Sequence, residues 1–196
     1  MGKILLIYLF AYFAGSVNFA IIIFKLTGKG DPRLSFSGNA GTTNVYRQAG
    51  ILWAVVIFLL DIGRAITVAF VAIYFLEMHL LPWVAFFLVL GNSYPCFHNF
   101  RGGKGVASYL GFTLIVAPWA ALASALIWLI VYGIVRITFI ASFFMVFILA
   151  CGQAFTFYWQ LGAITGAIAT FLLILFNHRK NIAEYRKTNE EQKSNK

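Results

Sequence analysis

The first segment that could do chemistry is the polar stretch 35–50, which reads SFSGNAGTTNVYRQAG. Its small residues let backbone N–H groups face a ligand, and its hydroxyl and amide side chains add further donors. The guanidinium of Arg47 suits a phosphate or a carboxylate. We interpret the segment as an anion-binding loop; the alternative is an ordinary solvated loop, in which Gly and Asn form turns. Its candidate ligands are Ser37, Gly38, Asn39, Thr43, Asn44 and Arg47.

The second segment, residues 100–108, reads FRGGKGVAS and opens a predicted helix. A glycine-rich approach to a helix N-terminus favours an anion, because free backbone N–H groups point outward there. The candidate residues are Gly102, Gly103 and Lys104, and their spacing is not that of a nucleotide-binding P-loop. The alternative interpretation is a flexible, positively charged anchor on the inner face of a membrane.

The third segment, residues 177–187, reads NHRKNIAEYRK. His178 and Asn181 are three residues apart, so they share one face of a helix. The alternative for His178 is a surface histidine that compensates the helix dipole. Ser142 belongs to a separate apolar run, where it either reaches the same site or bonds to the backbone of its own helix.

One pair of opposite charges, Asp61 and Arg64, falls inside an apolar run at a spacing of three residues. Charges within a membrane are costly and usually face the interior of a helix bundle. We expect the two side chains to pair, and the sequence fits a structural ion pair and a functional one equally well.

The sequence shows no serine–histidine–aspartate pattern and no cluster with metal-ligand spacing. We therefore expect no metal and no cofactor. Two donor-rich loops on one face, described below, instead suit a site that positions one or more anions and neutralises their charge.

Composition determines what kind of element must hold these segments. Of the 196 residues, 61% are hydrophobic and only 11% are charged. An average soluble domain is about 45–50% apolar and about 25% charged, so a soluble protein is excluded. Having only two cysteines excludes a disulfide scaffold, and the 21 Phe and 5 Trp in long apolar runs exclude disorder of the folded body. The chain is predicted to be an all-α integral membrane protein, with the lipid bilayer as its surroundings and no nucleic-acid partner.

Seven apolar runs are predicted to cross the membrane as one domain, 1–196, since a spanning helix needs about 20 residues, or about 17 at the short end. The predicted spans are 4–24, 51–75, 81–97, 106–117, 119–135, 138–154 and 157–176, and a polar tail, 177–196, follows. Lys and Arg accumulate on the cytoplasmic side of membrane proteins. With the N-terminus outside and the C-terminus cytoplasmic, Lys3 and Arg64 are the exceptions among 15 Lys and Arg residues. This topology places all three polar segments on the cytoplasmic face of a bundle of about seven transmembrane helices.

The three segments together resemble one family, the bacterial acyl-phosphate glycerol-3-phosphate acyltransferases called PlsY. The family's first motif, G-S-G-N-x-G-x-T-N-x-x-R, is matched at Ser37, Gly38, Asn39, Gly41, Thr43, Asn44 and Arg47. The second, G-H-x-x-P-x-F-x-x-F-K-G-G-K-G-V-A-T, is matched at Gly91, Pro95, Phe97, Phe100, Gly102, Gly103, Lys104, Gly105, Val106 and Ala107. The third region is matched at Ser142, His178, Arg179, Asn181 and Ile182.

The chain departs from these patterns at several positions. Phe36 stands for the leading Gly of the first motif, and Asn92 stands for the His of the second. Asp61 and Arg64 resemble a D-x-x-K pattern, with Arg in place of Lys. The remaining replacements are Arg101 for Lys, Ser108 for Thr, and Glu184 at a position where a basic residue is common.

The resemblance implies transfer of a fatty acyl group from acyl-phosphate to the 1-hydroxyl of sn-glycerol 3-phosphate, giving lysophosphatidic acid for phospholipid synthesis in the bacterial inner membrane. We expect catalytic roles for Lys104, Ser142, His178 and Asn181. The first loop and the Gly102–Lys104 turn would hold the acyl-phosphate head, and no obligate protein partner is evident. The rival hypotheses are a small organic-anion transporter and a catalytically weakened family member that acts as a scaffold.

Overall fold

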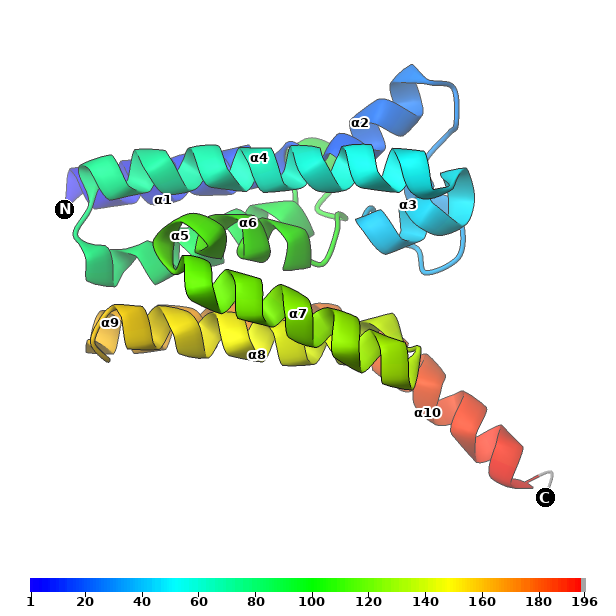
Figure 1. The fold of residues 1–196 in the computed structure, drawn as a ribbon. Coiled ribbons are helices and arrows are strands. Elements are labelled where there is room, and N and C mark those ends of the chain that lie inside the picture. Colours follow the sequence, from blue (N-terminus) through cyan, green and yellow to red (C-terminus); the bar gives the residue numbers. More distant parts are fainter. Residues whose placement is uncertain (195–196) are drawn as a thin grey trace.

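The computed structural model describes residues 1–194, and its regular elements there are all helical. Figure 1 shows them as a bundle of roughly antiparallel helices with smaller helices at one end. The longer helices are α1 (Gly2–Ser16), α4 (Ile51–Phe75), α5 (Leu81–Ser93), α7 (Pro118–Val135), α8 (Thr138–Thr156), α9 (Leu161–Asn177) and α10 (Arg179–Ser194). The shorter ones are α2 (Phe19–Leu26), α3 (Thr42–Ala49) and α6 (Val106–Val116), with 3₁₀ turns at Pro32–Leu34, Met78–Leu80 and Cys96–His98.

The lengths of the apolar helices differ from the seven predicted spans. Five segments are long and apolar enough to cross a membrane, or six if the bent pair α9–α10 counts as one span. Helix α6 has 11 residues, which is about 17 Å at about 1.5 Å per residue and less than the ~30 Å hydrocarbon core. The predicted span 106–117 is therefore too short to cross alone, because the break at Pro118 divides one apolar region unequally.

The predicted first span, 4–24, lies within the segment Gly2–Leu26, which is long and apolar enough to cross a membrane but is interrupted once. α1 ends at Ser16 and α2 begins at Phe19, and the side chain of Asn18 caps α2 by accepting a hydrogen bond from the N–H of Ile21 (3.1 Å). The predicted third span, 81–97, lies within the candidate span Met78–His98, whose α-helical part ends at Ser93. Most of the polar tail continues as α10, at 46° to α9.

The bundle packs closely where small residues meet. A side chain at Gly15 of α1 would collide with the carbonyl of Leu88, and one at Gly91 of α5 would collide with the carbonyl of Tyr12. Such contacts let two helix backbones approach, which is the usual way that helices associate in a bilayer. Large apolar side chains elsewhere, among them Leu59, Phe70 and Leu126, point outward and are exposed. An apolar exterior around a close-packed interior is the expected form of an integral membrane protein.

The polar segments gather at the end of the bundle opposite the N-terminus. In Figure 1, the N-terminus and the α4–α5 connection lie at one end, and α3 and α10 lie at the other. The connection from α5 to α6 returns toward that second end and meets the first loop, where the N–H of Ala40 donates to the carbonyl of Gly102 (3.1 Å). The fold therefore brings the first two predicted segments into direct contact.

Candidate active site

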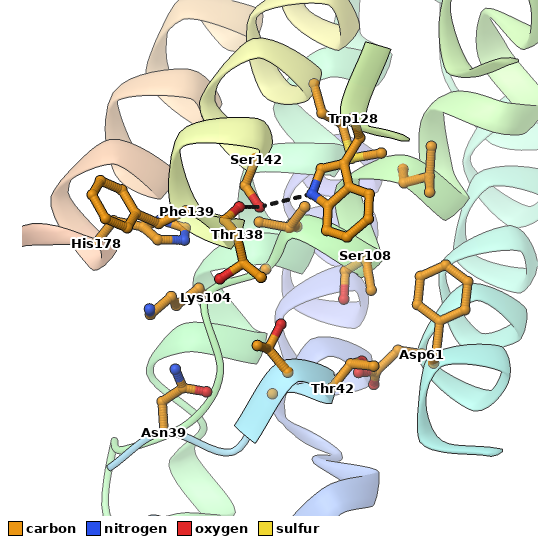
Figure 2. A pocket seen from close by; sticks show the side chains of 18 of the residues that line it. Asn39, Thr42, Asp61, Lys104, Ser108, Trp128, Thr138, Phe139, Ser142 and His178 are labelled. Atoms are coloured by element: carbon orange, nitrogen blue, oxygen red, sulfur yellow. Dashed lines mark hydrogen bonds between the residues drawn. The ribbon is translucent and has the colours of Figure 1, made fainter. Parts of the chain in front are cut away.

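A cavity of about 440 Å³ opens at this polar end, between the first loop, the α5–α6 loop and helices α4, α6, α7, α8 and α10. Figure 2 shows Lys104, His178 and Ser142 on one side of it, and Asp61 and Thr42 on the other. The sequence-predicted residues that line it are Ser37, Asn39, Thr43, Arg47, Lys104, Ser142, His178 and Asn181. The predicted residues that do not line it are Gly38, Asn44, Gly102 and Gly103.

Asn44 holds the first loop in shape from inside. Its side chain is 1% exposed and donates to the carbonyls of Pro32 (2.7 Å), Ser35 (3.2 Å) and Asn39 (2.8 Å). Its oxygen accepts from the backbone N–H of Ser37 (3.2 Å). Four bonds from one buried amide fix the backbone on which the lining residues stand, so Asn44 positions the loop.

Gly102 and Gly103 likewise shape the site from behind its surface. The N–H of Gly102 donates to the carbonyl of Ser93 (3.1 Å), and that of Gly103 donates to the carbonyl of Asn92 (3.0 Å). A Cβ at Gly103 would lie 2.8 Å from the side-chain nitrogen of Asn92. The glycines are needed because the loop backbone lies directly against the end of α5.

Two helix N-termini meet at the cavity. Thr42 and Thr43 form the first turn of α3, and Val106, Ala107 and Ser108 form that of α6; all five line the cavity. The first N–H groups of a helix have no partner within the helix and carry partial positive charge, which favours anions.

The N-terminus of α6 was predicted from its glycines, but that of α3 was not, because a loop rich in Gly, Asn and Thr hides a two-turn helix. Thr42 lines the cavity, and its buried hydroxyl has no hydrogen-bond partner among the described residues.

Lys104 connects the second and third segments by donating a hydrogen bond to the side-chain oxygen of Asn181. Burial lowers the pKa of Lys104 to about 8; the charge of Arg47 also lowers it, and Glu184 opposes the shift. The ammonium group of Lys104 is partly desolvated and lies near a second cation, and both effects disfavour its charged form. A bound phosphate would stabilise that charge, so the group suits a phosphate ligand.

His178 follows the last residue of α9 and is 3% exposed. Its Nδ1 lies 2.8 Å from the carbonyl of Ile174. Because a carbonyl can only accept, Nδ1 carries the proton and Nε2 is left as an acceptor. Burial, with the charge of Lys104, lowers the pKa of His178 to about 4, so the ring is neutral at physiological pH.

Ser142 does both things that the sequence offered as alternatives: it bonds to the backbone of its own helix and it reaches the site. Its hydroxyl donates to the carbonyl of Thr138 (2.9 Å) in its own helix and also lines the cavity. The indole N–H of Trp128 donates to the Ser142 oxygen (3.3 Å), as Figure 2 shows. Trp128 and Thr138 line the cavity too; the sequence did not reveal them, since each lies in an apolar run that reads as ordinary membrane helix.

The part of the cavity away from the loops is apolar. Its walls there come from Phe58 of α4, Leu110 of α6, Leu129 of α7 and Met145 of α8. Leu129 is 62% exposed on the outer surface of the bundle, so this wall reaches the face that meets lipid. The cavity thus joins an anion-binding end to an apolar end, which suits a molecule with a charged head and a fatty chain.

These features define an integral membrane protein with one cavity, lined by both anion-binding and apolar groups, at one end of a helical bundle. The family model described as "Glycerol-3-phosphate acyltransferase" matches residues 5–188. The chain belongs to this family. Membership favours the acyltransferase over the transporter hypothesis.

Curated relatives and solved structures agree with that assignment. The glycerol-3-phosphate acyltransferase of Aquifex aeolicus is 38% identical over 186 residues, which cover 92% of this chain and 94% of the relative. That of Methylobacillus flagellatus is 37% identical over 173 residues, 88% of each chain. The crystal structure of PlsY in its glycerol 3-phosphate form superposes with a TM-score of 0.85 at 35% identity, covering 95% of this chain and 94% of that one. The lysophosphatidic acid form gives 0.82 at 34% identity, covering 95% and 93%.

Proposed function

We propose that this protein transfers a fatty acyl group from acyl-phosphate to the 1-hydroxyl of sn-glycerol 3-phosphate. The products are lysophosphatidic acid and inorganic phosphate. One observation carries the proposal: two helix N-termini, Arg47 and Lys104 surround a single cavity whose other end is apolar. Two phosphate groups and one fatty chain match this distribution of charge and surface.

The reaction needs little covalent chemistry from the protein. The 1-hydroxyl oxygen attacks the acyl carbon, the bond from that carbon to the phosphate oxygen breaks, and phosphate leaves with the electron pair. Acyl-phosphate is a mixed anhydride with a good leaving group, so no acyl-enzyme is required. What remains is to hold two anions in line and to stabilise the charge that develops between them.

The lining residues divide into two groups in this proposal. Ser37, Asn39 and Thr43 hold the acyl-phosphate head at the N-terminus of α3. Ser142, His178 and Asn181 hold glycerol 3-phosphate. Arg47 and Lys104 lie between the groups and neutralise both phosphates, while Asn44, Gly38, Gly102 and Gly103 maintain the loop shapes rather than touch substrate.

The proton of the attacking hydroxyl goes to a phosphate oxygen of a substrate. A histidine whose pKa is about 4 is a weak base, which supports the phosphate over His178 as the acceptor. The free Nε2 of His178 still accepts a hydrogen bond from glycerol 3-phosphate. His178 therefore orients the acceptor substrate in this proposal.

We also propose that the active site faces the cytoplasm of the bacterial inner membrane, with the N-terminus outside and seven alternating chain passes. The polar loops gather at one end of the bundle, and the Lys and Arg residues concentrate there. Seven passes require the short α6 to share its passage with the loop before it and with neighbouring helices.

The test uses purified protein in lipid nanodiscs, given palmitoyl-phosphate and glycerol 3-phosphate, with phosphate release followed over time. We expect phosphate release that depends on glycerol 3-phosphate. With palmitoyl-CoA as the donor, which would release CoA rather than phosphate, we expect neither free CoA nor lysophosphatidic acid. A Lys104→Ala variant supplies the background. Release no faster than that background, or acylation from palmitoyl-CoA, would contradict the proposal.

A further inference from the structure

Arg64 lies behind the wall of the cavity and is the most densely bonded charged side chain in the bundle interior. It does not line the cavity, and its side chain is 7% exposed. Its partner in charge is Asp61, one turn earlier on α4, at 3.1 Å. Asp61 does line the cavity, so the pair lies across its wall.

One terminal nitrogen of the guanidinium donates hydrogen bonds at the break between α1 and α2. Nη1 donates to the carbonyl of Gly15 (3.2 Å) and to that of Val17. The last carbonyls of a helix have no partner within the helix, and inside a bilayer water is not there to replace one. Arg64 therefore satisfies backbone groups that the break would leave unpaired.

The other terminal nitrogen donates hydrogen bonds to residues of the cavity wall. Nη2 donates to the side-chain oxygens of Asn92 (3.0 Å) and Ser108 (2.8 Å), and both of these residues line the cavity. Ser108 belongs to the first turn of α6, and the backbone of Asn92 binds Gly103 in the second loop. The planar guanidinium of Arg64, a fork of N–H donors, thus connects α1, α5 and α6 at the N-terminus of α6, where we expect an anion to bind.

We infer that Arg64 is a positioning residue for the substrate phosphates, acting through Asn92 and Ser108 on the N-terminus of α6. A lysine at this position has a single side-chain nitrogen. It cannot donate both to the carbonyls at the α1–α2 break and to Asn92 and Ser108 in the cavity wall. Removing the fork should loosen α6 and the second loop, while the ionic charge beside Asp61 is kept.

The same contact relates two departures from the family motifs. Arg64 stands where the pattern has Lys, and Asn92 stands where it has His. The two side chains bond directly, with the amide oxygen of Asn92 accepting from the guanidinium. A histidine at 92 would present a ring to a bulky cation, whereas a lysine at 64 would leave room for it. Because the two side chains bond directly, we expect the effects of substitutions at these two positions to depend on each other.

The test is a double-mutant cycle of Arg64→Lys, Asn92→His and the double variant, measured in nanodiscs. We expect Arg64→Lys to lower the melting temperature, because the carbonyls at the α1–α2 break lose a donor, but to remain folded at the assay temperature. There it should lose at least fivefold in glycerol 3-phosphate affinity and at least tenfold in kcat/KM. Asn92→His alone should also lose at least fivefold in affinity. The double variant should be less impaired than the product of the two single losses. Thr67→Ala is the matched control, since Thr67 lies one turn from Arg64 and is exposed, and its hydroxyl donates to the carbonyl of Gly63 in its own helix (3.0 Å).

Three results would overturn the inference: Arg64→Lys within twofold of the parent, single losses that simply multiply, or activity that falls only in step with the melting temperature. If Arg64→Lys does not fold, Asn92→His and Ser108→Ala decide, because both keep the guanidinium; normal affinity in both overturns the inference.

The kinetic part rests on the proposed acyl-phosphate reaction, whereas calorimetric binding of glycerol 3-phosphate does not. An inactive parent protein would contradict the proposed function, and the binding cycle would still decide the role of Arg64.

Discussion

Lys104 and Asn181 are 77 residues apart in the chain, yet the ammonium of the first donates a hydrogen bond to the amide oxygen of the second. The bond connects the loop before α6 to the helix that follows the last span. It places the main cation of the cavity beside His178, the residue whose free ring nitrogen faces the acceptor substrate in our proposal. The behaviour of this corner with pH follows directly.

Activity should fall at high pH because Lys104 loses its charge. Its pKa is lowered to about 8, so the cationic form predominates below pH 8 and is lost as the pH rises through that value. We expect the KM for glycerol 3-phosphate to rise by about tenfold per pH unit well above the pKa. Kinetics between pH 6 and 9.5 measure this, and Lys104→Arg should move the loss above that range. A KM that is flat to pH 9.5 in the parent protein would contradict the role of Lys104.

His178 should contribute no ionisation near the ordinary histidine pKa of 6.5, because its pKa is lowered to about 4. Any ionisation at about pH 6 should belong to the substrate phosphate and should persist in His178→Ala. His178→Ala should raise the KM for glycerol 3-phosphate by about tenfold to a hundredfold, since one oriented hydrogen bond to a charged ligand is worth about 1.5–3 kcal/mol. Its kcat at saturating glycerol 3-phosphate should stay within about fivefold. A fall in kcat of a thousandfold would instead identify His178 as the general base.

Asn44 and Asn39 should separate stability from catalysis. Asn44→Ala removes four buried hydrogen bonds and should lower the free energy of unfolding by about 2–3 kcal/mol, seen as a lower melting temperature. Asn39 lines the cavity, and among the described residues its amide donates one long bond, to Ser37 (3.4 Å). Asn39→Ala should reduce kcat/KM with an unchanged melting temperature. Equal effects of the two substitutions on both quantities would rule out this division of roles.

The apolar end of the cavity should set the preferred acyl chain. Ala125 of α7 lines the cavity and is half-buried, whereas Leu126 beside it is 59% exposed toward lipid. Ala125→Phe should lower kcat/KM for palmitoyl-phosphate by about tenfold, and for an eight-carbon acyl-phosphate much less, because overfilling a packed space costs about 1–3 kcal/mol. Leu126→Phe is the matched control. An equal loss for both donors would show that the chain binds elsewhere.

How much of this could be read from the sequence depends on the kind of signal. Charge bias and hydropathy predicted a helical membrane protein, and the structure confirms it. Lys104, His178 and Asn181 were expected on one face from topology alone, and they line one cavity. Local spacing could not show that the side chain of Asn44 turns inward. In a polar segment of sequence, an asparagine that stabilises the loop cannot be distinguished from one that binds a ligand.

Other features depend on tertiary contacts that a linear pattern does not contain. Helix α6 has 11 residues because the helical run ends just before Pro118. A hydropathy profile averages over this break and so does not reveal the length of the helix. Trp128 and Thr138 join the site because α7 packs on α8 there, and both stand in runs that hydropathy reads as plain membrane helix. The partners of Arg64 come from three other helices, so pairing with Asp61 was the only one that spacing could predict.

The most direct test of the central claim is the stoichiometry of a single reaction. Protein in nanodiscs is given palmitoyl-phosphate and glycerol 3-phosphate, and inorganic phosphate and lysophosphatidic acid are measured in the same samples. The account predicts one lysophosphatidic acid for each phosphate released, at a rate that Lys104→Ala lowers by about a hundredfold or more. Phosphate release without lysophosphatidic acid, or the same rate in the Lys104→Ala variant, would contradict it.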